Sequence, residues 1–121
     1  MVFETIYLLR ERVLSVAQSE VQIPIKSLKD VIFRELLEED SVAIYPSEKE
    51  LDEDLKTLQE MSFLTISGDM VVINRESFLN ATKFVERQEE LLKDDKYATA
   101  LFAKLKQRAQ RIQVLQQEST Q

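Results

Sequence analysis

Glycine and proline are so rare in this chain that its breaks in regular structure are few and well marked. Of the 121 residues, only Gly68 is a glycine, and only Pro24 and Pro46 are prolines. These two residue types are the strongest local interrupters of helices and strands. The stretches between them are therefore expected to be regular. Loops that cradle phosphates need several glycines for close backbone approach, so such loops are excluded.

Cysteine and histidine are absent from the chain. Their absence excludes disulfides, thiolate nucleophiles, imidazole bases and the commonest zinc ligands. A magnesium or calcium site built from carboxylates alone would need a glycine-containing loop that the chain lacks. The acidic residues 38–40 and 52–54 fall in a polar loop and on an exposed helix rather than in a cleft. We therefore expect no enzyme, no metal and no cofactor.

A mass of 14.1 kDa and a hydrophobic share of 44% are enough for one compact core. The first ten residues carry an acid at Glu4 and lack the basic lead of a signal peptide. Charges interrupt every apolar run before the ~20 residues that a membrane span requires. With no cysteine to exploit an oxidising compartment, we expect a cytoplasmic protein, with a nuclear or viral setting left open.

Three helices are expected in the first half of the chain. Residues 3–17 repeat apolar side chains at intervals of three and four, and a short β-branched run at 21–25 follows, confined to a sheet edge by Pro24. Ser27 and Asp30 have capping-box spacing, which predicts a helix that begins after Ser27. Ser47 and Glu50 have the same spacing and predict a helix over residues 48–61. The apolar positions of the last two helices are Leu28, Ile32, Leu36, Leu51, Leu55 and Leu58.

An alternating pattern follows, over residues 63–66 and 70–73, on either side of Gly68 and Asp69. This dipeptide suits a tight primed turn, so the two runs are expected to form a β-hairpin. A two-residue loop pairs Ile66 with Val71 and Leu64 with Ile73, with all four side chains facing the core.

Residues 76–116 contain no glycine or proline and predict a helical arm. Residues 93–96 interrupt its apolar stripe, and Asp95 could cap a second helical segment there. The second stripe steps by three and four, which is typical of a coiled coil or an antiparallel helix pair. We expect the stripe to form a dimer or partner interface through Phe78, Val85, Leu92, Ala98, Phe102, Leu105, Ala109 and Ile112.

The order of helix, short strand, helix, helix and hairpin over residues 3–74 resembles the winged-helix superfamily. Residues 47–74, SEKELDEDLKTLQEMSFLTISGDMVVIN, resemble its third helix and wing in layout. The expected fold class is mainly α with a small β-hairpin, that is α+β. A winged-helix domain at 1–75 would be followed by a dimerising arm at 76–116, either one long helix or a helical pair, and by a disordered tail at 117–121.

The resemblance implies that residues 48–61 form a recognition helix, with the wing tip at Gly68. Here the chain departs from the DNA-binding pattern, because residues 48–60 hold six acids against Lys49 and Lys56. Residues 1–75 carry eight basic and fifteen acidic side chains, a net charge of −7, while residues 76–121 carry +1. Duplex DNA, with one negative charge per ~1.7 Å of axis, would be repelled.

The arm holds a cluster of four basic residues, Lys104, Lys106, Arg108 and Arg111. The cluster is either the solvated flank of the stripe, a surface that docks on the acidic domain of a second copy, or a phosphate contact. Together with Lys49 and Lys56, these residues are the candidate contacts for nucleic acid or an acidic partner.

A solitary helix with this stripe would expose a large apolar patch, which monomers seldom tolerate. Covering each large side chain is worth roughly 1.5 to 3 kcal/mol. We therefore predict a non-catalytic binding module that acts through protein–protein interaction, as a homodimeric assembly or regulatory protein. The alternative is a winged-helix transcriptional regulator dimerised through its C-terminal helix. The expected partner is a second copy or another protein; charge disfavours nucleic acid, and no membrane or small-molecule ligand is expected.

Overall fold

The computed structural model describes residues 2–112 of the chain and is mixed α+β. In chain order its elements are α1 (Val2–Leu14), β1 (Glu20–Pro24), α2 (Ile25–Lys29), the π-helix η1 (Asp30–Glu39), α3 (Glu48–Glu60), β2 (Thr65–Ser67), β3 (Met70–Asn74), α4 (Leu79–Leu91) and α5 (Lys96–Ala109). None of the helices in this part of the chain is both long and apolar enough to cross a membrane. The tail expected at 117–121 lies outside the described residues.

The three strands form one antiparallel sheet in the order β1-β3-β2. The register pairs Ile66 with Val71 across the hairpin, which confirms the predicted pair and the two-residue loop. Gly68 has a φ of +60°, as a primed turn with glycine at its first central position requires. The paired residues of β2 end at Thr65, so the predicted pair of Leu64 with Ile73 falls one residue outside the register. On the other side of β3, the edge strand β1 pairs its buried residues Val21 and Ile23 with Ile73 and Val71.

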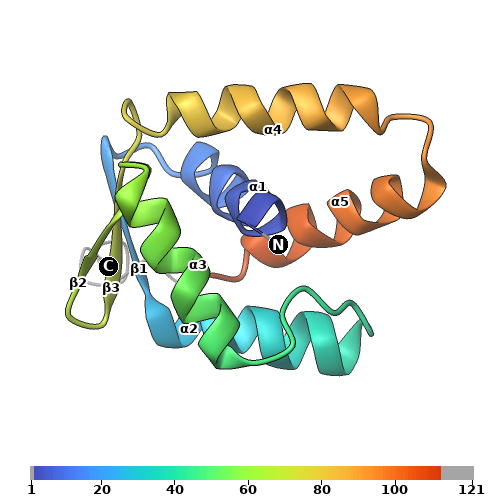
Figure 1. Ribbon diagram of the computed structural model, residues 1–121, viewed down its shortest axis with the longest axis horizontal. Helices are drawn as coiled ribbons and strands as arrows, with labels where there is room; N and C mark the ends of the chain where they lie inside the picture. Colours follow the sequence, from blue (N-terminus) through green and yellow to red (C-terminus); the bar gives the residue numbers. More distant parts are fainter. Residues whose placement is uncertain (1, 113–121) are drawn as a thin grey trace.

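Helix α1 lies between α4 and α5, with which it makes its main helix contacts (Figure 1). The consecutive residues Thr5 to Leu9 are all buried, so that the helix is covered on most of its circumference. A helix that is buried all round must be enclosed by other elements. The arm supplies that enclosure, because α4 and α5 form a hairpin that folds back over α1. Residues from α1, the sheet, α3, α4 and α5 thus share a single core, rather than the separate domain and arm expected at 1–75 and 76–116.

Helix α2 begins at Ile25, three residues before the predicted start, and Ser27 does not cap it. Pro24 precedes the helix in an extended conformation and has no N–H of its own to satisfy, so the proline is the boundary that the capping-box argument missed. The same helical segment continues as η1, in which the Asp40 N–H donates to the Glu35 carbonyl five residues back, as in a π-helix.

The break in the arm is confirmed at Asp95, whose carboxylate accepts a hydrogen bond of 3.1 Å from the Ala98 N–H. This contact satisfies one of the N–H groups that have no partner at a helix start. The chain reverses between the end of α4 at Leu91 and the start of α5 at Lys96 (Figure 1). The reversal positions the second apolar stripe against α1.

Candidate functional site

The apolar stripe expected to meet a partner faces the interior of its own chain. Of the eight predicted interface residues, Leu92 is half-buried and the other seven are buried; these are Phe78, Val85, Ala98, Phe102, Leu105, Ala109 and Ile112. This differs from the expectation of an exposed seam. The physical cause is the helix break at Asp95, which lets α5 turn back and cover its stripe on α1. The spacing of the stripe predicts that it packs against another helix, but it does not specify which one.

Aromatic contacts attach α5 to α1. The rings of Tyr7 and Phe102 are stacked, with centroids 4.8 Å apart and an interplanar angle of 11°. Phe3 meets Phe102 edge-on at a centroid distance of 5.7 Å. Such pairs add roughly 0.5 to 1.5 kcal/mol beyond the burial of their surface. Phe102 is therefore a main anchor of α5 on the first helix.

The basic cluster of α5 contacts the acidic end of η1 in the same chain. The Arg108 Nε donates to Asp40 at 2.7 Å, and its Nη2 donates to the other Asp40 oxygen at 3.0 Å. The same Nη2 lies 3.3 Å from Glu39, and Nη1 lies 3.7 Å from Glu35. The Arg108 side chain is only 8% exposed. Arg108 therefore makes a buried bidentate contact between α5 and the end of η1, rather than lying on a solvated flank or contacting a second copy.

The other three basic residues of the cluster lie at the rim of this contact. Lys104 is 3.5 Å from Asp40, and Arg111 is 3.5 Å from Glu35. Lys106 contacts α4 instead, at 3.9 Å from Glu89, and lies over the Tyr7 ring. These residues thus take part in holding α5 in place.

The electrostatics explain why cations gather at this end of η1. Glu39 is the last residue of η1 and Asp40 caps its C-terminus, where the partial negative charge of the helix repels carboxylates. The hydrogen bonds from Arg108 hold the pKa of Asp40 below its usual range. In return, the contact with Asp40 raises the pKa of Arg108. Without α5, this cluster of acids would repel itself.

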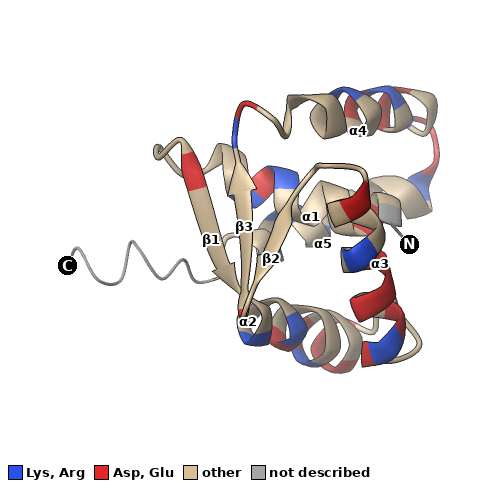
Figure 2. Cartoon of the chain, turned by 60° about the vertical axis from the view of Figure 1, so that its left-hand side comes forward, with Lys and Arg blue, Asp and Glu red and all other residues tan. Residues whose placement is uncertain are grey.

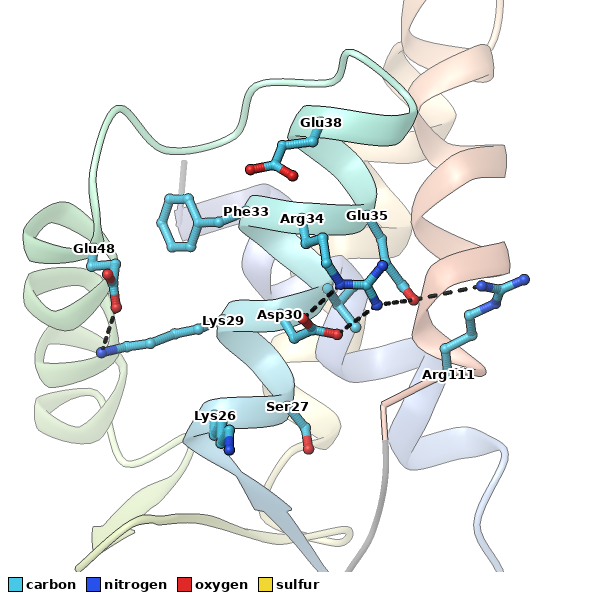
Figure 3. Close-up of a pocket in the computed structure, with 11 residues that line it drawn as sticks. Lys26, Ser27, Lys29, Asp30, Phe33, Arg34, Glu35, Glu38, Glu48 and Arg111 are labelled. Atoms are coloured by element: carbon cyan, nitrogen blue, oxygen red, sulfur yellow. Dashed lines mark hydrogen bonds and ion pairs between the residues drawn. The ribbon is translucent and has the colours of Figure 1, made fainter.

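An open groove of about 870 Å³ runs over α2 and η1, between the start of α3 and Arg111 (Figure 3). Phe33 is its half-buried apolar residue. Lys29 is 3.1 Å from Glu48, and the Arg34 Nε is 2.8 Å from Asp30. Two of the cations that line the groove, Lys29 and Arg34, are thus already paired with acids of the same chain.

The outward face of α3 carries mixed but mainly negative charge, as Figure 2 shows along that helix. Lys49 and Lys56 are both exposed there. Asp52, four residues before Lys56 on the same helix, lies 3.7 Å from Lys29 of α2. The structure therefore does not bring Lys49 and Lys56 together with the basic cluster of α5, which contacts η1 and α4.

Comparisons of the chain with protein-family models, with curated proteins and with solved structures give no match. The case for function therefore rests on these surfaces.

Proposed function

We propose that this chain is a non-catalytic protein-binding module of the winged-helix type. The element order from α1 to β3 supports the fold assignment, as does the sheet order β1-β3-β2, in which the hairpin stands beside β1. In this interpretation, α3 corresponds to the recognition helix and the turn at Gly68 to the wing tip.

The charge of α3 is the observation that carries the proposal. The helix holds six acids and two lysines, and the turn beside it adds Asp69. Lys29 partly neutralises two of the acids, Glu48 and Asp52, but that lysine is thereby occupied. A duplex presented to this face meets like charge, whereas a protein can offer complementary groups. A protein partner is therefore favoured over nucleic acid.

A titration of the purified chain against mixed-sequence duplex DNA tests the proposal, with fluorescence anisotropy as the signal. Low salt, about 20 mM, gives electrostatic binding its best chance. We expect no binding at protein concentrations up to about 10 µM. That concentration lies within the roughly 10⁻⁴ to 10⁻⁶ M range of non-specific dissociation constants at physiological salt, and low salt makes such binding tighter still. Binding in this range with a steep salt dependence would overturn the proposal.

The alternative is a DNA-binding regulator, which the same element order favours. Helix α3 contains no arginine, so Lys49 and Lys56 would be its cationic contacts. If DNA does bind, a Lys49→Glu, Lys56→Glu double variant should abolish binding, while the control Lys93→Glu, at the far end of the arm hairpin, should retain most of it. That combination of results would identify α3 as the DNA-contacting helix and replace the proposal with the alternative.

A further inference from the structure

The outward face of α4 exposes large apolar side chains that the fold covers only in part. Phe84 is 54% exposed, with its ring edge-on to that of Phe3 at a centroid distance of 6.4 Å, and Leu91 is 69% exposed, whereas Val85, next to Phe84 in the sequence, is fully buried. Figures 1 and 2 both place α4 along one edge of the described chain. Helix α4 therefore covers α1 with one face and presents a second apolar face to its surroundings.

The exposed face has the spacing of a helix-pairing seam. Asn80, Phe84, Arg87 and Leu91 follow one another at intervals of four, three and four, which places them on one stripe of a helix with 3.6 residues per turn. All four are exposed. The buried stripes of the arm have the same three-and-four spacing, but this stripe lies on the side of α4 that its own chain covers least.

The charges beside the seam identify a second copy of the chain as its occupant. Lys83 directly precedes Phe84, and Glu90 directly precedes Leu91, so both flank the seam on the same side. In antiparallel pairing of two identical helices, residues on this flank meet each other across the axis. Lys83 of one copy then lies opposite Glu90 of the partner subunit, twice in each dimer. A parallel arrangement would not form this pair of contacts.

We propose that α4 pairs antiparallel with α4 of a second copy, through Phe84, Arg87 and Leu91, with Lys83 and Glu90 matching across the two-fold axis. The proposal rests on the proposed function as a protein-binding module and supplies its partner. Glu90 also lies 2.9 Å from Lys93 in the turn after α4, but both side chains are mostly exposed, and such pairs exchange at little cost. The 13 residues of α4 span roughly 20 Å. A seam of this length predicts a weak, reversible dimer.

Sedimentation equilibrium of the full chain tests the pairing at protein concentrations from about 1 to 500 µM, a range suited to a small interface. We expect the mass to rise from 14.1 kDa towards twice that value. Leu91→Asp should weaken association at least about tenfold, because it places charge in the seam. Leu79→Asp is the matched control: it lies on the same helix, also half-exposed, but about 120° around the axis from Leu91. Its dissociation constant should stay within about threefold of the parent value.

Charge reversal tests the antiparallel geometry without relying on apolar residues. Lys83→Glu and Glu90→Lys should each weaken the dimer, because each puts like charges opposite one another, and the double variant should restore it. A chain that remains a monomer throughout overturns the pairing, as does a double variant that fails to recover. Equal weakening by the Leu79 control also overturns it. Each of these results would leave the proposed function standing if DNA still failed to bind, so the two failures are distinguishable.

Discussion

Leu105→Ala is the sharpest test of the arm folded back on α1. Leu105 is fully buried in the core that α5 shares with α1. The substitution removes the equivalent of three methylene groups, worth roughly 0.8 kcal/mol each on transfer from water. A cavity adds to this loss where the surroundings do not collapse, so we expect destabilisation of about 2.5 to 5 kcal/mol. For a chain of this size, that is a large share of the roughly 5 to 15 kcal/mol by which domains are stable.

Urea unfolding followed by circular dichroism measures this change, with Tyr97→Ala as the control on the same helix. Tyr97 is 74% exposed, so its removal should change the free energy of unfolding by no more than about 0.5 kcal/mol. The Leu105→Ala loss should be independent of protein concentration, because the contacts lie within one chain. A loss below about 1 kcal/mol, or a loss relative to the parent that changes with protein concentration, would refute the reasoning and restore an arm that is covered by another molecule.

Three further predictions concern single residues. The Asp40 pKa is lowered in the folded state, so its contribution is present above the unfolded value of about 4 and is lost as pH falls below it. In thermal unfolding from pH 7 to 2, the deficit of Asp40→Asn relative to the parent should therefore shrink in acid; a deficit that stays constant would contradict the linkage. Ser62 has a φ of 65°, so Ser62→Gly should raise the free energy of unfolding by about 0.5 to 1 kcal/mol in urea. Gly68 has a φ of 60°, so Gly68→Ala should lower it by about 1 to 2 kcal/mol. Changes of the same sign in the two variants would be inconsistent with backbone strain. Asp95→Ala removes the cap of α5 and should cost about 1 kcal/mol by the same assay, and no loss at all would show that the cap is unimportant.

Local signals in the sequence predicted local structure well, because each acts within a few residues. The turn at Gly68 requires a positive φ, and the cap at Asp95 bonds the third residue after it. Both were predicted at the correct positions. The predicted start of α2 was wrong because two local signals competed. The fixed φ of Pro24 set the start of the helix, and the side chain of Ser27 did not.

The arrangement of the arm could not be read from spacing alone. A stripe such as that of α5 shows that one face of the helix is apolar. Its periodicity is the same whether a second copy or the chain's own α1 covers that face. The contact of Arg108 with acids of its own chain was not predicted for a related reason, since a run of cations usually lies in solvent. A signal was present: Arg108 follows Leu105 by three residues and precedes Ile112 by four, so it lies on the buried side of the helix. Its acidic partner Asp40 is 68 residues away in sequence, beyond the range of any local pattern.

The enclosure of α1 also affects how the protein is made. Helix α1 leaves the ribosome before the helix that stacks on Tyr7, which is completed only at Ala109. At ~5 to 20 residues per second, synthesis of the intervening chain takes about 5 to 20 s. During that time the nascent chain presents Tyr7, Leu8 and Leu9, which are buried in the finished fold, without their final cover. Completion of α5 is thus the step that ends this exposure.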